Sequence, residues 1–254
     1  MKSIKPLYLI IFMLVSPVSL AQQAGKDIYA NPENLKVLPE DISSRDLGNT
    51  MKGFAMGLGA RCETCHVGEP DTPLDTFDFA SDEKDMKRKA RVMIKMVREI
   101  NDVFVPGLNE IEDSPRVEVR CVTCHRGLQQ PKLIQDVLDE QLAENGLEAT
   151  LVKYAKLRDD YFGSHSYDFS EFTLPMYVQG LAKKKKLQEA IALEKVNAGY
   201  FPESYYTFFV LAELYKVANQ TELAIESYTT AIRLNPQAKS FLEGRIATLS
   251  GEAK

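Results

Sequence analysis

Apolar residues recur at every third or fourth position along most of the chain, and this spacing predicts helices that each bury one face. The strongest example covers residues 81–101, where lysine and arginine occupy the positions opposite the apolar stripe. Ser81 or Asp82 is expected to cap this helix, because acidic residues follow in the first turn, where the helix dipole favours them. The apolar stripe consists of Ala90, Met93, Val97 and Ile100.

Further helices are predicted on both sides of this segment. One covers residues 46–58 and ends at glycines, which allow a sharp turn into the next segment. Two more, at 135–144 and 147–162, are joined by an Asn-Gly pair, and a last helix is expected at 239–249. The pattern therefore predicts an all-α fold.

The C-terminal half also contains a repeat. With a shift of about 34 residues, one copy matches the signature of tetratricopeptide (TPR) repeats. An earlier, degenerate copy has Glu194 and Asn197 where that signature has aromatic and small residues. Such helix pairs bury their apolar faces only against neighbours, so we expect a TPR-like helical-repeat domain over residues 132–254. The complete copy is formed by Phe208, Leu211, Ala212, Tyr215, Ala224, Tyr228, Ala231 and Pro236.

Composition and charge narrow the class of protein. The chain has 254 residues, of which 44% are hydrophobic and 26% charged, as is typical of a globular protein. Its net charge of −5 argues against nucleic acid as a partner, because nucleic acid selects a basic surface. A basic protein surface would be the better match.

The N-terminus has the pattern of a signal peptide over residues 1–21. Lys2 and Lys5 precede an apolar run at 7–15, and small residues up to Ala21 form a cleavage site. The run is shorter than the roughly 20 residues that span a membrane. We therefore expect export to the periplasm with cleavage of this segment, and the alternative is an uncleaved membrane anchor.

All four cysteines of the chain belong to two copies of one motif, Cys-x-x-Cys-His. Disulfides or a zinc site are the alternatives for paired cysteines in an exported protein. Neither explains why histidine directly follows the second cysteine both times, whereas covalent haem attachment requires this order. The motif thus predicts two c-type haems. The first haem would be attached through Cys62 and Cys65, with His66 as the proximal iron ligand. The second would be attached through Cys121 and Cys124, with His125 as the proximal iron ligand.

The supply of histidine limits the choice of the distal iron ligands. Only three histidines are present, and the third, His165, lies in a polar loop. At least one iron therefore needs another ligand or has an open position, and methionine is the usual soft alternative. The candidates beyond the signal peptide are Met51, Met56, Met86, Met93, Met96 and Met176.

Spacing favours some of these methionines. Met51 lies about three helical turns before Cys62, so its helix could cross the haem face opposite the Cys-x-x-Cys-His turn. Met56 is close to the glycine turn and has less room to reach the iron. On the helix over residues 81–101, spacing does not distinguish Met93 from Met96.

These residues resemble a known family. Residues 35–131 are similar to the haem-binding repeats of the photosynthetic reaction-centre cytochrome c subunit. One repeat is matched by residues 51–66, with methionine eleven residues before the first cysteine. Another is matched by residues 90–101, which begin Ala-Arg-Val-Met, together with Val-Arg-Cys-Val-Thr-Cys-His-Arg-Gly over 119–127. In that family the methionine after Ala-Arg-x is an axial ligand, which implies Met93 for the second haem and, by correspondence, Met51 for the first.

The chain also departs from that family. It has two attachment motifs where the reaction-centre subunit has more, and it lacks the family's additional histidine between Asn101 and Cys121. Two-haem relatives of this module occur in non-photosynthetic bacteria. The resemblance therefore implies a haem module without implying a photosynthetic role.

Taken together, the sequence predicts a two-haem cytochrome module over residues 22–131 followed by the TPR-like half. With both irons six-coordinate, it predicts an electron carrier with no catalytic residues. Its partners would be redox proteins, a membrane-bound complex among them, docked through the TPR-like half. The alternatives are a peroxidase-like two-haem enzyme with one open iron, and a scaffold subunit of an exported redox complex.

Overall fold

The computed structural model describes residues 27–111 and 117–251, so the predicted signal peptide lies outside the described residues. Helices connected by loops form this part of the chain, and the described residues include no β-strand, only an isolated bridge between Val67 and Asp78. The predicted all-α fold is confirmed. None of the helices in the described ranges is long and apolar enough to cross a membrane.

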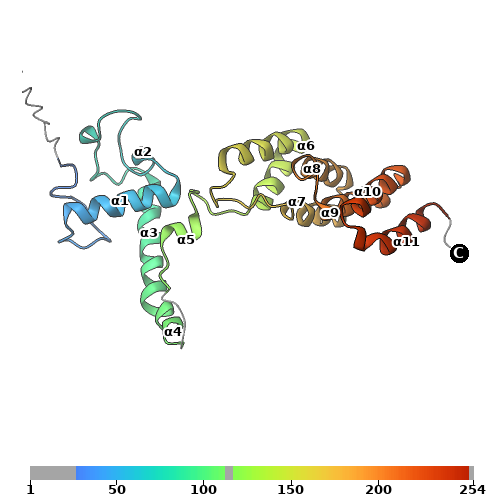
Figure 1. Ribbon diagram of the computed structural model, residues 1–254. Coiled ribbons are helices and arrows are strands. Elements are labelled where there is room, and N and C mark those ends of the chain that lie inside the picture. Colours follow the sequence, from blue (N-terminus) through green and yellow to red (C-terminus); the bar gives the residue numbers. More distant parts are fainter. Residues whose placement is uncertain (1–26, 112–116, 252–254) are drawn as a thin grey trace, which may run out of the picture.

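The first group of helices contains both cysteine motifs (Figure 1). The long helix α1 is followed by a one-turn helix at the first motif, and α3 continues through a π-helix, η2, into α4. A second one-turn helix, α5, carries the other motif. The bounds are α1 Ser44–Leu58, α2 Cys62–Cys65, η1 Leu74–Thr76, α3 Asp85–Glu99, η2 Ile100–Phe104, α4 Val105–Asn109 and α5 Cys121–His125.

Local sequence accounts for both ends of α1. Ser43 caps its N-terminus, where the side-chain Oγ accepts a hydrogen bond from the backbone N–H of Asp46 at 3.1 Å. Gly59 follows the last turn in the left-handed conformation, and its N–H bonds carbonyls of that turn. The predicted helix over 46–58 therefore matches the structure closely.

The predicted start of the next helix is wrong. We expected Ser81 or Asp82 as its cap, but α3 begins at Asp85, and Lys84 at the cap position makes no side-chain cap hydrogen bond. Asp82 instead pairs with Lys36 and Arg91. Charge-assisted hydrogen bonds to two cationic side chains stabilise a carboxylate more than a single bond to a backbone N–H group at a helix end does.

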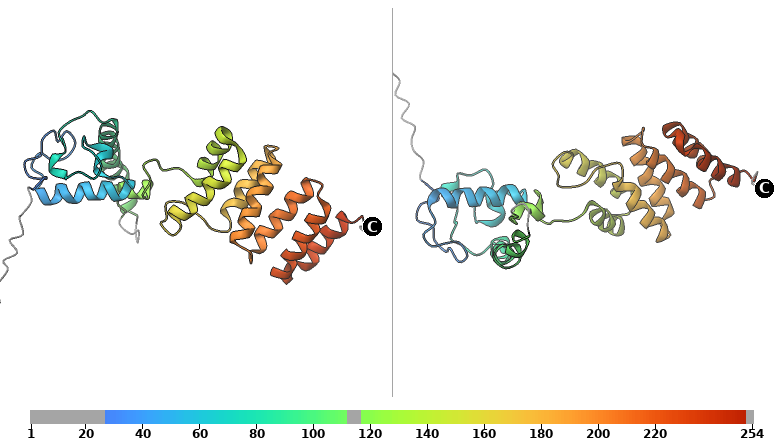
Figure 2. Two further views of the ribbon diagram at one scale, coloured as in Figure 1. Left: turned by 90° about the horizontal axis from the view of Figure 1, so that it is seen from above. Right: turned by 60° about the horizontal axis from the view of Figure 1, so that its bottom comes forward.

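The second group of helices extends away from the first and is arranged in successive layers (Figure 2). Within α6 the backbone of Gly146 is non-helical, with φ of 78°, so this element is two helices joined where the Asn-Gly pair was expected to separate them. The bounds are α6 Ile134–Tyr161, α7 Thr173–Lys183, α8 Leu187–Tyr200, α9 Tyr205–Val217, α10 Thr221–Leu234, η3 Pro236–Ala238 and α11 Lys239–Leu249.

Consecutive helices of this second group pack against each other, with α7 on α8, α8 on α9, α9 on α10 and α10 on α11. One apolar core runs from α6 to α10, and a smaller one joins α9, α10 and α11 around Tyr228 and Leu242. This is the stacking that a helical repeat needs. The assignment to the TPR class itself stays a prediction.

Candidate haem sites

An apolar cavity lies between α1, the first cysteine motif and α3. Met51 of α1 lines it together with Cys62, Cys65 and His66, so the structure brings the four residues predicted for the first haem to one cavity. The wall is completed by residues 28–38 and by one face of α3. Apolar members of that wall include Tyr29, Leu35, Leu38, Phe54, Leu58, Phe79, Ala90 and Ile94.

The first motif holds its histidine by local geometry. Cys62 to Cys65 form one helical turn, after which the backbone N–H of His66 donates to the carbonyl of Cys62 at 2.9 Å. The ring of Phe79 packs edge-on against the imidazole, with 4.9 Å between ring centroids. Burial, with help from the positive charge of Lys87, lowers the pKa of His66 and favours the neutral imidazole that binds iron.

The second motif fixes its histidine by a hydrogen bond. His125 at the end of α5 is buried, and its Nδ1 lies 2.8 Å from the carbonyl oxygen of Leu128. Because a carbonyl only accepts, Nδ1 carries the proton and Nε2 keeps a free lone pair. A backbone carbonyl on the far nitrogen is the usual orienting partner of a metal-binding histidine.

Glycines bring the two motifs close together. The N–H of Gly127, just after the second motif, donates to the carbonyl of Gly57 in α1 at 2.9 Å. Gly59 adopts a φ of 57°, and a Cβ on it would lie 2.1 Å from the carbonyl oxygen of Gly127. Only glycine allows this approach, which joins the end of α1 to the loop after α5.

Asn101, in the π-helix η2, fixes the segment before the second motif. Its Nδ2 donates to the carbonyl of Val119 at 2.7 Å, and its Oδ1 accepts from the N–H of the same residue at 2.8 Å. The amide thus pairs with the backbone as a neighbouring strand would. π-Helical turns inside α-helices frequently occur at functional sites.

The distal ligand of the second site is less defined. Met93 is not among the residues of the first cavity, although Ala90 and Ile94 of the same helix are. It has 36% of its surface exposed and Met96 has 41%, so burial does not distinguish them either. The role of Met93 therefore stays a prediction that rests on the family resemblance.

The other sequence candidates lie away from the first cavity. Met56 is 78% exposed and Met176 is 67% exposed, as expected for side chains directed to solvent. His165 is also exposed, in a loop where its own φ is 65°. None of these three lines the cavity.

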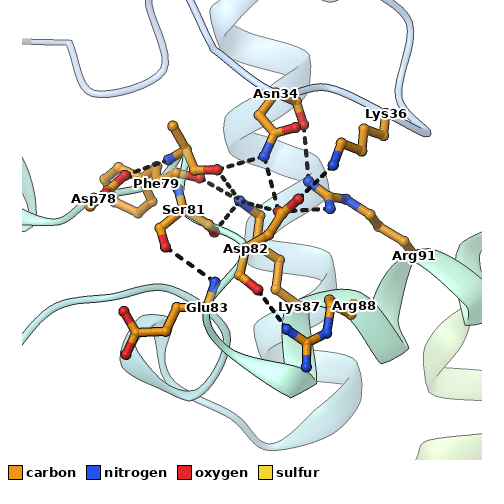
Figure 3. Close-up of polar contacts among 11 residues, drawn as sticks. Asn34, Lys36, Asp78, Phe79, Ser81, Asp82, Glu83, Lys87, Arg88 and Arg91 are labelled. Carbon is orange, nitrogen blue, oxygen red and sulfur yellow. Dashed lines mark hydrogen bonds and ion pairs between the residues drawn. The ribbon is translucent and has the colours of Figure 1, made fainter.

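Figure 3 shows a polar cluster that sequence reasoning missed. Its members Asn34, Lys36, Lys87 and Arg91 line the first cavity. At the centre of the cluster Asp82 contacts Lys36 at 2.6 Å, Arg91 at 2.7 Å and Lys87 at 3.4 Å. The Nδ2 of Asn34 donates to the same carboxylate at 2.9 Å. These hydrogen bonds, that of Arg91 foremost, hold the pKa of Asp82 well below its usual range. The sequence contained one indication of this cluster: Lys87 and Arg91 are about one helical turn apart, so they lie on the same side of the helix.

The alternatives for the cysteines gain no support. No disulfide joins the four cysteines, two of which are exposed. Within the described ranges, no group of three or more His, Cys, Asp and Glu side chains is placed to hold a metal ion, as a zinc site combining both pairs would require. By contrast, the first apolar cavity is lined by the groups that a c-type haem needs. These are two thiols for covalent attachment, and an imidazole and a thioether as axial ligands of the iron.

Two curated relatives share part of the sequence. Over 106 residues the chain is 34% identical to cytochrome c-554 of Chloroflexus aurantiacus, covering 41% of this chain and 23% of that protein. Over 113 residues it is 34% identical to the photosynthetic reaction center cytochrome c subunit of Roseobacter denitrificans, covering 44% and 28%. The chain thus spans about a quarter of the length of these relatives. No solved structure matches it.

The family model described as photosynthetic reaction centre cytochrome C subunit matches residues 12–191, which is more than half of the chain. The match includes both cysteine motifs and extends past the predicted boundary at residue 131 into α8. The resemblance inferred from the motifs is therefore confirmed: the chain belongs to the photosynthetic reaction centre cytochrome c subunit family.

Proposed function

We propose that this protein is an exported c-type cytochrome that carries electrons between redox partners through two covalently attached haems. The observation that carries the proposal is the first cavity, which is lined by Met51 as well as by Cys62, Cys65 and His66. A bound haem supplies an iron that gains and loses one electron. The chain supplies both axial ligands, so the iron has no open position for a substrate.

For the second haem we propose Cys121 and Cys124 as thioether residues, His125 as the proximal ligand and Met93 as the distal ligand. The fixed tautomer of His125 supports this arrangement, as does the Asn101 clamp on the segment before α5. The contact between Gly57 and Gly127 keeps the two attachment sites close. A short path for electrons between the haems would follow.

Haem number and ligation can be tested on the purified exported protein. We expect its mass to exceed that of the chain from Gln22 onward by two haems, and both ferric haems to be low-spin with a methionine–iron charge-transfer band. A protein with fewer haems, or with a high-spin component, would contradict the proposal. A high-spin component would favour the peroxidase-like enzyme.

Matched methionine variants test the axial ligands. Met51→Ala and Met93→Ala should each remove about half of the charge-transfer band, because each deletes one of the two thioether ligands. Met56→Ala and Met96→Ala, on the same two helices, serve as controls and should leave the band intact. If Met96→Ala removes intensity and Met93→Ala does not, the ligand of the second haem is reassigned.

We further propose that the C-terminal half docks the redox partner. It has an apolar core of its own from α6 to α11, which the haem sites do not use. A fragment of residues 132–254 should then slow electron transfer between the intact cytochrome and its partner membranes by competing for them. If the folded fragment does not compete, this half supports the haem module and docks no partner.

A further inference from the structure

One face of α3 brings positive charge to the wall of the first cavity. Lys87 and Arg91 lie on the same side of the helix as Ala90 and Ile94, and all four line the cavity that also contains His66. The two cations therefore lie at the site proposed for the first haem. The other charged groups of this wall are Glu33, Lys36 and Arg61.

Lys87 and Arg91 differ from these other groups in burial. The side chain of Lys87 is 11% exposed and that of Arg91 is 14% exposed, whereas Lys36 is 59% and Arg61 is 71% exposed. Water and salt screen exposed charges effectively but screen buried ones much less. The field at the cavity should thus come mainly from Lys87 and Arg91.

Both cations are held in place by the backbone around the cavity. The ammonium of Lys87 donates to the carbonyls of Phe79, Ala80 and Ser81 at 2.8, 3.0 and 2.7 Å. Arg91 donates to the carbonyl of Asn34 at 3.1 Å. These contacts fix the charges in position, and Figure 3 shows them converging beside Asp82.

The cluster has more positive than negative charge. Asp82 is the carboxylate that contacts Lys36, Lys87 and Arg91 together, and it does not itself line the cavity. The three positive groups, by contrast, do line it. Asp82 offsets only part of their charge.

We propose that Lys87 and Arg91 raise the reduction potential of the first haem. This inference rests on the proposed function, in which an iron bound by His66 and Met51 occupies the cavity. Oxidation of ferrous to ferric iron releases one electron to the redox partner and leaves one more positive charge at the site. Fixed cations beside the iron oppose that change, and nearby charge is one of the levers that set haem potentials.

The test is a spectroelectrochemical titration of the intact two-haem protein and of single variants. The component whose potential moves in Met51→Ala is assigned to the first haem. Lys87→Met, which keeps the length of the side chain and removes its charge, should lower this potential and leave that of the second haem unchanged. We expect the potential to fall by about 59 mV, which corresponds to a tenfold change in the equilibrium constant for transfer of one electron.

Three further variants separate charge from structure. Asp82→Asn should raise the same potential, because it removes the negative charge that offsets the cations. Lys87→Arg should keep it near the wild-type value. Lys89→Gln, an exposed position two residues along α3 and so on the opposite side of the helix, should move neither potential.

The outcomes are distinct from those of the proposed function. If both haems are attached with intact methionine–iron bands and Lys87→Met leaves the first potential unchanged, the inference is wrong while the function stands. If Lys87→Met and Asp82→Asn shift it in the same direction, the cluster acts as a structural clamp and the inference is again wrong. Should Lys87→Met fail to fold, Arg91→Gln must lower the same potential, and an unchanged value would contradict the inference.

Discussion

Before α6 the described chain buries few apolar side chains, namely those of Leu47, Phe77, Val105 and Leu128, whereas α6 to α11 share extended apolar cores. The contacts that join the first region are instead the Ser43 cap of α1, the glycine contact between Gly57 and Gly127, and the ionic contacts beside one cavity. The second region is stabilised by burial of apolar surface between stacked helices. Two helical regions of one chain therefore differ in the interactions that hold them together.

This difference suits different tasks. A cavity wall made of helices and loops leaves room for a flat cofactor and can place charges beside it. Stacked helices expose long outer faces while keeping their cores closed. If the comparison is correct, a change to the proposed haem ligands should affect only the first region, and a change to a buried group of α8 only the second.

The largest effect should follow replacement of all four cysteines by serine. Without thioether bonds the region from α1 to α5 has few buried apolar contacts, so we expect its amides to lose most of their protection from hydrogen exchange. The amides of α6 to α11 should keep theirs. Exchange measured by mass spectrometry decides this, and equal loss of protection in both regions would contradict the comparison.

The next effect concerns Glu194 in the second region. This side chain is fully buried on α8, where its Oε1 accepts a hydrogen bond from Nδ2 of Asn197 at 3.3 Å. Burial raises its pKa from an ordinary 4.5 to about 8. Between these two values the folded state binds more protons than the unfolded state, so stability should fall as the pH rises through this window. We expect a loss of about 3 kcal/mol between pH 5 and pH 8.

Glu194→Gln tests this origin, because the neutral amide has no proton to lose. The variant should be more stable than the wild type at pH 8 and show a flatter dependence of unfolding free energy on pH. Denaturant titrations followed by circular dichroism measure both quantities. An unchanged pH dependence would mean that another group controls the stability of this region.

A smaller effect is expected at the glycine contact of the first region. Gly59→Ala places a Cβ where the carbonyl of Gly127 lies and forces an unfavourable positive φ, so it should destabilise the protein by about 2–3 kcal/mol. Gly53→Ala is the matched control, since it lies within α1 with nothing within 4 Å of its Cβ. It should stabilise by about 1 kcal/mol. Thermal unfolding compares the two, and equal effects would exclude a special role for Gly59.

Local sequence signals predicted much of this fold. Helical periodicity located α1, the break at Gly146 and α11 to within a few residues, because these features depend on neighbours in the chain. The start of α3 was misplaced because Asp82 pairs with Arg91 and with Lys36, and Lys36 lies 46 residues away in the sequence. Tertiary contacts of this kind override capping preferences.

The same distinction applies to the site. That Met51 shares one cavity with Cys62, Cys65 and His66 could be predicted, because these residues are close together along the chain. The contribution of residues 28–38 to the cavity wall, and the clamp between Asn101 and Val119, join segments far apart in the sequence. A single sequence has no spacing rule for such contacts, so only the structure reveals them.

The smallest predicted effects compare one serine cap from each region. Ser43 caps α1 and is exposed, whereas Ser204 caps α9, is 6% exposed and accepts from the N–H of Thr207 at 3.2 Å. Water can replace the lost partner at the exposed cap but reaches the buried one poorly. Ser43→Ala should therefore cost about 0.5 kcal/mol, and Ser204→Ala about 1.5 kcal/mol. Hydrogen exchange should place the first loss at the start of α1 and the second across α8 to α10, since a stacked core unfolds as a unit and a single helix end can fray alone.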